Sequence, residues 1–311
     1  MKIAIFGQAQ FGRDVTEGLA DAGHEIVVIY APAEGRRTDP LAELASERGW
    51  PLRRPRRFRR RGEAIAELVD EHRGFGAELN VMPFTTVILP SEIVEAPLHG
   101  SLCFHPSKLP AYRGGSAIAW QIILGATETA ATVFRPDEGV DTGPIVVQRT
   151  GIPIEPHDTA ASLYFDKLYP AGVEAMAEAV AAVADGTAVF TPQSEQGASH
   201  QPLLLDEHAR IDWSAPPETV DRLVRGCDPN PGAWGELGGE RVRLYGARLE
   251  PEGARSDAAP GSLIAYQDGA AQIALLGARL RVAKLRVGEG PKQAAAESGV
   301  APGTGLAPSI A

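Results

Sequence analysis

An apolar run that ends in a histidine followed by a proline constrains the fold of this chain more than any other feature. Ser101 to Phe104 is typical of a buried strand, and Pro106 lacks the amide that a longer strand ladder would need. We therefore expect the strand to end at His105. Ligands of open α/β sheets bind beyond the carboxyl ends of strands, so this imidazole would face a crevice. The alternative is a histidine that only ends a strand.

A glycine-punctuated loop forms the second constraining feature. The sequence EGVDTGP, at Glu138 to Pro144, follows another strand-like run at Thr129 to Phe134. This loop places Asp141 just after a predicted strand, and His105 likewise stands at the end of one. An imidazole and a carboxylate are the groups that general acid–base chemistry uses most often. The presence of this loop therefore favours a functional role for His105 over that of a histidine that only ends a strand.

The amino-terminal part alternates strands and helices, which predicts an α/β, Rossmann-like domain over residues 1–190. The turn Gly7 to Gly12 departs from the dinucleotide fingerprint, because Ala9 stands where the second glycine should be. NAD is therefore not expected. We expect strands at 2–6, 25–30, 78–82, 101–104, 130–134 and 145–149, and helices at 14–22, 40–48, 63–73, 91–95, 117–124 (capped by Ser116) and 159–184.

The sequence changes character after residue 190. Residues 191–202 are polar and are predicted as a linker. One amphipathic helix at 216–225 and short alternating runs at 241–245, 262–266, 272–276 and 280–285, separated by glycine-rich turns, predict a small OB-like β-barrel over 203–290. Residues 291–311 are rich in Ala, Gly and Pro, and we expect a flexible tail there.

Composition limits the partners and the compartment. The 311 residues carry a formal net charge of −10, which gives no general attraction to nucleic acid or to an anionic membrane. The apolar run at the amino terminus is too short for a signal peptide or a membrane span. Cys103 and Cys227 lack metal-ligand spacing, so we expect no metal and a reducing cytoplasmic setting.

The segment PLRRPRRFRRRG is the exception to this acidic composition. It holds seven arginines between Arg53 and Arg61. Guanidinium groups pair well with acidic ligands such as a phosphate, a polyglutamate tail or tRNA. A solvated loop in which arginine replaces lysine is the alternative. Basic residues do not outnumber acidic ones after Leu203, so binding of nucleic acid is not expected there.

Two motifs together, HPSKLPAYRGGSA and DEGVDTG, resemble the folate-dependent formyltransferase family, which includes methionyl-tRNA formyltransferase. The segments MKIAIFGQAQFG, GAELNVMPF, ILPSEI, ARIDW and PGAW are most similar to the hydrolase domains of 10-formyltetrahydrofolate dehydrogenases within it. The resemblance covers roughly Met1 to Leu285. It implies a Rossmann-like domain followed by a small barrel, in agreement with the pattern above.

The resemblance also implies roles for individual residues. His105 and Asp141 match the family's catalytic histidine and aspartate, while Cys103 stands where most members have an asparagine. Cys103 is then either an inert buried thiol or a covalent nucleophile. A slot for the pterin ring is implied at Phe84, Thr86, Val87 and Leu89, with the backbone of Asp137, Gly139 and Val140.

The function implied by the resemblance is formyl transfer from 10-formyltetrahydrofolate. An asparagine would donate to the developing oxyanion, and a thiol is a weak donor, so transfer to water is expected, giving formate and tetrahydrofolate. Transfer to an amine, such as methionyl-tRNA or an amino-sugar nucleotide, is the alternative. A folate-binding protein without catalysis is the second alternative.

Overall fold

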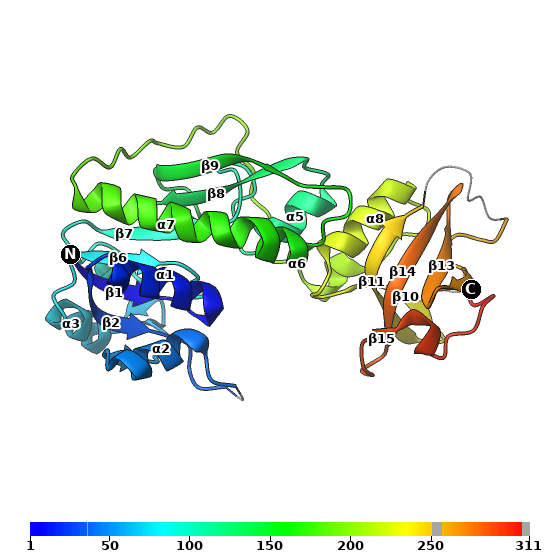
Figure 1. Cartoon of the computed structure of the whole chain (residues 1–311), viewed down its shortest axis with the longest axis horizontal. Helices are drawn as coiled ribbons and strands as arrows, with labels where there is room; N and C mark the ends of the chain where they lie inside the picture. Colours follow the sequence, from blue (N-terminus) through cyan, green and yellow to red (C-terminus); the bar gives the residue numbers. More distant parts are fainter. Residues whose placement is uncertain (36, 251–256, 307–311) are drawn as a thin grey trace. The chain divides into compact units, whose positions relative to one another are not determined.

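The computed structural model describes residues 1–35, 37–250 and 257–306, which form two compact units (Figure 1). The first unit contains residues 1–115, 129–152 and 166–200. The second contains residues 116–128 and 153–165 together with the chain from 201 onward. The domain limits drawn from the sequence, 1–190 and 203–290, stay a prediction.

The first unit is built on a seven-stranded sheet with the order β3-β2-β1-β6-β7-β8-β9. Strands β3, β2, β1, β6 and β7 run parallel, and β8 is antiparallel to β7. Its strands are β1 (Lys2–Phe6), β2 (Glu25–Tyr30), β3 (Leu52–Arg53), β6 (Leu79–Met82), β7 (Ser101–His105), β8 (Glu128–Phe134) and β9 (Ile145–Pro153). The predicted Rossmann-like α/β architecture is confirmed.

Helices cover both faces of this sheet. Ile3 and Ile5 of β1 pack into a core with α1 (Ala9–Asp21), α2 (Pro40–Arg48) and α7 (Tyr169–Ala184). The alternate residues Ala4 and Phe6 pack into a second core with α3 (Ala66–Gly74) and α4 (Ser91–Val94). This alternation is the period-2 pattern of a strand that is buried on both faces. Figure 1 shows α1 and α7 lying along the sheet.

Two expectations for this unit are wrong. The predicted turn Gly7–Gly12 is already helical from Ala9, because the carboxylate of Asp39 accepts from the backbone amide of Ala9 at 2.7 Å and satisfies the start of α1. The predicted helix 63–73 begins at Ala66. Before it, β4 (Arg59–Arg60) and β5 (Glu63–Ala64) form a hairpin, whose two turn residues both have positive φ.

The second unit is an antiparallel sheet accompanied by helices. The sheet runs β10-β11-β14-β13-β12, with β15 on β14, so the predicted antiparallel second sheet is confirmed. Its strands are β10 (Ala233–Leu237), β11 (Glu240–Leu249), β12 (Leu263–Gln267), β13 (Ala270–Leu275), β14 (Ala278–Val287) and β15 (Gln293–Ala294); its α-helices are α5 (Ala117–Ile123), α6 (Ala160–Ser162) and α8 (Pro217–Gly226). Short 3-10 helices lie at Asp206–Ala209 and Ala295–Glu297, and a π-helix, Leu163–Leu168, joins α6 to α7.

The segments expected to be least structured are packed. Leu306 is fully buried, and its carbonyl accepts from the indole of Trp213 at 3.1 Å, so residues up to 306 are not a flexible tail. Residues 307–311 lie outside the described residues. The predicted linker is also bound to its surroundings, since Thr191 exchanges backbone hydrogen bonds with Ile145.

Ser116 does not cap α5 with its side chain, which instead accepts from the amide of Leu204 at 3.0 Å. In the described part of the chain, no helix is both long and apolar enough to cross a membrane.

Candidate active site

His105 is the last residue of β7, where the sequence placed it. Side chains alternate along the strand, so Phe104 packs against Phe11 at a ring-centroid separation of 4.9 Å while His105 points to the opposite face. His105 is 6% exposed. Its Nε2 lies 2.9 Å from the carbonyl oxygen of Tyr112. A carbonyl only accepts, so Nε2 carries a proton, and in neutral His105 the free lone pair is on Nδ1.

Asp141 lies against that free nitrogen. Its Oδ2 is 3.5 Å from Nδ1 of His105 and accepts from the backbone amide of Gly114 at 2.8 Å. Burial lowers the pKa of His105 below 6.5, against the raising effects of Asp141 and of the Tyr112 carbonyl. The resting pair is therefore a neutral imidazole beside a carboxylate, and it can accept one proton.

The DEGVDTG motif has a steric explanation in the loop that carries Asp141. A side chain at Gly143 would put its Cβ 1.8 Å from the carbonyl oxygen of Arg135, and one at Gly139 would lie 2.0 Å from Oγ1 of Thr142. Asp137 closes the loop, accepting from the Gly139 amide at 3.0 Å and from the Thr142 hydroxyl at 2.6 Å. Only glycine allows the backbone to approach this closely, at Gly143 to the backbone of Arg135 and at Gly139 to the side chain of Thr142.

Gln193 anchors the loop from a distant part of the chain. Its Nε2 donates to the carbonyl of Asp141 at 2.9 Å and to that of Gly143 at 2.7 Å. Its Oε1 accepts from Arg113 Nε and Nη2 at 3.2 and 3.0 Å, and the Arg113 side chain is buried. Gln193 lies within the predicted linker, 191–202. Nothing in the local spacing shows its role, because its contacts reach 50 to 80 residues back along the chain.

Cys103 lies two residues before His105, and so on the same face of β7. Burial raises the pKa of its thiol well above the usual value, and the charge of Asp141 raises it further. Its Sγ is 3.7 Å from the backbone carbonyl of Phe104, to which it donates weakly. A thiol in this state is neither a good nucleophile nor a strong donor.

The residues proposed for the pterin ring are divided by the structure. Phe84, Thr86 and Val87 line a cleft of about 60 Å³ that follows the carboxyl ends of β1 and β6. Leu89 is 6% exposed and belongs to the core between the sheet and α3, so it does not line that cleft. Asp137, Gly139 and Val140 are exposed on the Asp141 loop. All of these binding assignments stay predictions.

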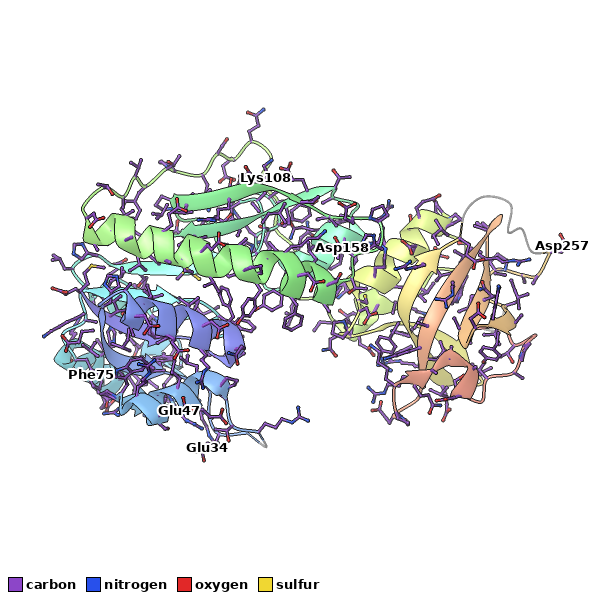
Figure 2. All side chains as sticks on the ribbon, viewed as in Figure 1. Glu34, Glu47, Phe75, Lys108, Asp158 and Asp257 are labelled. Atoms are coloured by element: carbon purple, nitrogen blue, oxygen red, sulfur yellow. The ribbon has the colours of Figure 1, made fainter. Side chains whose placement is uncertain are left out.

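The arginine-rich segment borders the same cleft through Pro55 and Phe58. Arg53 pairs with Glu71 at 2.5 Å and lies over the ring of Phe75, while Arg54 pairs with Glu34 at 3.2 Å; Figure 2 labels Phe75 and Glu34. Arg59 donates to the backbone carbonyls of Gly62 and Leu89. The remaining arginines of the segment are all exposed, Arg59 among them: Arg56, Arg57, Arg59, Arg60 and Arg61.

Comparison with known proteins shows the family of this chain. Family models match residues 1–180 (formyl transferase) and 204–299 (formyl transferase, C-terminal domain). The mitochondrial 10-formyltetrahydrofolate dehydrogenase of Mus musculus is 42% identical over 250 residues, which are 80% of this chain and 27% of that protein. The methionyl-tRNA formyltransferase of Dinoroseobacter shibae is 35% identical over 282 residues, covering 88% of this chain and 91% of that one.

A solved structure shows the same fold. HypX from Aquifex aeolicus in complex with tetrahydrofolic acid superposes with a TM-score of 0.70 at 23% identity, over 95% of this chain and 46% of that one. The chain thus spans about a quarter of the dehydrogenases' length and nearly all of the methionyl-tRNA formyltransferase. The first family model alone covers more than half of the 311 residues. On this evidence, the chain belongs to the formyl transferase family.

Proposed function

We propose that the chain transfers the formyl group of 10-formyltetrahydrofolate to water, releasing formate and tetrahydrofolate. The observation that carries this proposal is the contact between His105 Nδ1 and Asp141 Oδ2, beside Cys103 in place of an asparagine. Family membership and the likeness to dehydrogenases named for 10-formyltetrahydrofolate support the choice of substrate.

The pair supplies the proton movements of the reaction. Water attacks the formyl carbon, and its proton passes to the Asp141 and His105 pair, for which Nδ1 is the free basic nitrogen. The resulting imidazolium carries its charge next to the oxyanion that forms on the formyl oxygen. When the bond from the formyl carbon to N10 breaks, that proton goes to N10 of tetrahydrofolate. The products are formate, tetrahydrofolate and one proton, so atoms and charge balance.

The positions of the two protons refine the role of His105. In its neutral form the only N–H, on Nε2, is bound to the Tyr112 carbonyl at 2.9 Å and is not free to polarise the formyl oxygen. His105 therefore becomes a donor toward the substrate only after it has gained the proton of the nucleophile. Stabilisation of the oxyanion is then delayed until the charge develops, which is where it lowers the barrier.

Cys103 is the reason to favour water over an amine. Loss of one oxyanion donor costs about 3 kcal/mol in comparable enzymes, which leaves a slower reaction for any acceptor. Water needs no binding site of its own, whereas a bound amine does. The alternative, transfer to an amine such as that of methionyl-tRNA, is supported by the likeness to the Dinoroseobacter methionyl-tRNA formyltransferase.

The deciding experiment follows tetrahydrofolate by absorbance with 10-formyltetrahydrofolate and no acceptor. Hydrolysis predicts turnover that disappears in His105→Ala, and equal rates with and without methionyl-tRNA or an amino-sugar nucleotide. Turnover that depends on one of these amines, with a formylated amine in the mass spectrum, would support the transferase alternative. Tight folate binding by calorimetry without turnover under either condition would support the non-catalytic alternative.

A further inference from the structure

The backbone of Tyr112 decides which nitrogen of His105 carries the proton. Its carbonyl oxygen lies 2.9 Å from Nε2 of His105, whereas Oδ2 of Asp141 lies 3.5 Å from Nδ1. These two acceptors compete for the single proton of the neutral imidazole, because each would hold it on its own side of the ring. The shorter contact favours the proton on Nε2 and leaves Nδ1 as the basic nitrogen beside Asp141.

The carbonyl of Tyr112 is held in a strained position. Tyr112 has a φ of 61°, in the left-handed region that residues other than glycine seldom adopt. A backbone of this kind relaxes to negative φ unless its surroundings fix it, and the relaxation would turn the carbonyl away from His105. The contact to His105 therefore depends on the groups that hold Tyr112.

Ser199 holds both backbone amides next to this carbonyl. Its Oγ accepts from the amide of Tyr112 at 2.8 Å, and its own carbonyl accepts from the amide of Arg113 at 2.9 Å. The Arg113 amide belongs to the same peptide plane as the Tyr112 carbonyl, and in a trans peptide the two point in opposite directions. Ser199 thus holds this plane from the side opposite to His105. The amide of Ser199 donates to the carbonyl of Pro110 at 3.2 Å, which fixes Ser199 itself.

The remainder of the loop after β7 is fixed by other side chains. Oγ1 of Thr132 donates to the carbonyl of Ser107 at 2.6 Å. Nε2 of Gln148 donates to the carbonyl of Leu109 at 2.9 Å. Loss of the Ser199 hydroxyl should therefore have a local effect, and the loop as a whole should stay folded.

We propose that Ser199 is a positioning residue, which keeps the proton of neutral His105 on Nε2 and so leaves Nδ1 free to act as the base. Its effect on the rate rests on the proposed function, whereas the place of the proton is a property of the protein without substrate. When the hydroxyl is removed, the amide of Tyr112 loses its acceptor and the backbone relaxes. Asp141 then becomes the better acceptor, so the proton moves to Nδ1 and the basic nitrogen no longer faces Asp141.

Nitrogen NMR of the imidazole tests this assignment directly. At about pH 8, where His105 is neutral, isotopically labelled histidine gives distinct signals for a protonated and a bare ring nitrogen, and His105→Gln identifies the signals of His105. We expect the proton on Nε2 in the unaltered chain. In Ser199→Ala the ratio of the two tautomers should shift toward Nδ1 by about fivefold or more, the factor that one hydrogen bond contributes to an equilibrium. Ser199→Thr keeps the hydroxyl and should keep the proton on Nε2.

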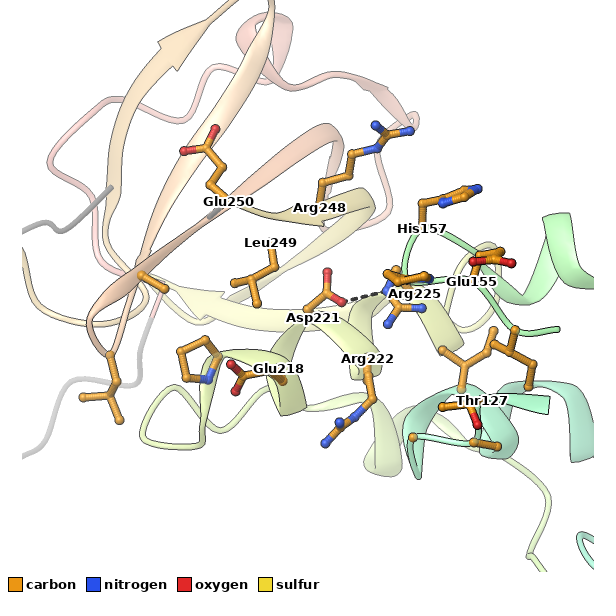
Figure 3. A pocket seen from close by; sticks show the side chains of 18 of the residues that line it. Thr127, Glu155, His157, Glu218, Asp221, Arg222, Arg225, Arg248, Leu249 and Glu250 are labelled. Carbon is orange, nitrogen blue, oxygen red and sulfur yellow. Dashed lines mark hydrogen bonds and ion pairs between the residues drawn. The ribbon is translucent and has the colours of Figure 1, made fainter. Parts of the chain in front are cut away.

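Steady-state kinetics with matched variants measures the consequence for the reaction. Ser199→Ala should lower kcat for hydrolysis about tenfold, with less change in KM, because Ser199 does not border the cleft of Phe84 and Thr86. Ser199→Thr should keep most of the activity. Two controls remove exposed hydroxyls elsewhere and should keep the kcat of the unaltered chain. Ser194→Ala lies in the same segment, and Thr127→Ala lies in the wall of a cavity of about 780 Å³ in the second unit (Figure 3).

The proposal is overturned by a proton on Nδ1 in the unaltered chain, or by the same ratio of tautomers in Ser199→Ala as in the unaltered chain. A loss of kcat that Ser199→Thr shares would overturn it as well, since that variant keeps the hydroxyl. If Ser199→Ala does not fold, Ser199→Cys puts a weak acceptor of similar shape at the position and should shift the ratio in the same direction; an unchanged ratio there would also refute the proposal. An unaltered chain without hydrolase activity would contradict the proposed function, and the tautomer measurement would still decide the role of Ser199.

Discussion

The side-chain amide of Gln193 holds the backbone of Asp141 in place, donating to its carbonyl at 2.9 Å. Asp141 has a φ of 55°, in the left-handed region that non-glycine residues seldom adopt. Such a backbone persists only where its surroundings fix it, and Gln193 does so while it is itself fixed by the buried Arg113. The carboxylate facing His105 therefore depends on a glutamine 52 residues away.

Replacing Gln193 with alanine should lower kcat for hydrolysis roughly 10- to 100-fold, because a small displacement of a catalytic group is costly. KM should change much less, since Gln193 does not line the cleft of Phe84 and Thr86. Steady-state kinetics separates the two constants. Gln196→Ala, an exposed position three residues further on, is the control and should be unaffected. An equal loss in both variants would show that only the stability of the segment matters.

The rate of hydrolysis should depend on pH through His105. Burial lowers the pKa of His105 below 6.5, so neutral His105 persists on the acid side of its usual range and the rate should be level near pH 7. Below the lowered pKa the pair already holds its proton and the rate should fall. Profiles of kcat against pH should show a half-point below pH 6.5, and Asp141→Asn should remove most activity at every pH. A rate that rises as pH falls would contradict the proposed proton acceptor.

The sequence predicts much of the site because its signals are local. Pro106 ends β7 at His105, and the glycines around Asp141 fix a loop whose close contacts lie within eight residues of one another. The start of α1 could not be predicted, since the carboxylate that satisfies Ala9 belongs to Asp39, thirty residues on. The Gln193 contacts could not be predicted either, because they too join residues that are far apart in the sequence.

A single long-range contact explains two errors in the second unit. Gly235 weakens the strand signal of β10, and the glycine is needed because a Cβ there would lie 2.6 Å from the carbonyl oxygen of Leu306. Leu306 belongs to the segment that composition marks as a tail. Neither β10 nor the packing of Leu306 can be predicted from its own segment, because each depends on the other and the two lie far apart in the sequence.

Acid should destabilise the first unit through His72. This side chain is 1% exposed, between Phe6 and Tyr30, and burial lowers its pKa to about 4. The unfolded chain binds a proton near pH 6.5 and the native chain does not, so the free energy of unfolding should decrease by up to about 3 kcal/mol between pH 6.5 and pH 4. Urea unfolding at several pH values measures this. His72→Leu should flatten the dependence of the unfolding free energy on pH, and His157→Gln, at an exposed site, should not. Identical slopes in the unaltered protein and in both variants would refute the assignment of this dependence to His72.

The exposed arginines should act on substrate binding if they meet an acidic ligand. Replacing Arg56, Arg57 and Arg60 with glutamine should raise KM severalfold for a donor with a polyglutamate tail and leave kcat unchanged, because the segment borders the cleft of Phe84 without reaching His105. The effect should shrink as salt is added. Arg73→Gln, which removes an exposed arginine of α3 that pairs with Asp70 at 3.9 Å, serves as the control. An unchanged KM would leave these arginines as a solvated surface.

Variants of Cys103 distinguish a mechanism in which the thiol is inert from one in which it is a covalent nucleophile. Its raised pKa keeps the thiol protonated, so Cys103→Ala should leave hydrolysis within a few-fold, whereas His105→Ala and Asp141→Ala should each remove most of it. Cys103→Asn would place an amide donor at the position where the family resemblance implies an asparagine, and should lower the barrier to formyl transfer by up to about 3 kcal/mol where its geometry fits. It should also let an added amine compete with water. A covalent role predicts an inactive alanine variant and a formyl-thioester in the mass spectrum of enzyme quenched during turnover. An active alanine variant without that mass shift excludes a covalent route through Cys103, because the thioester could form on no other atom of that side chain.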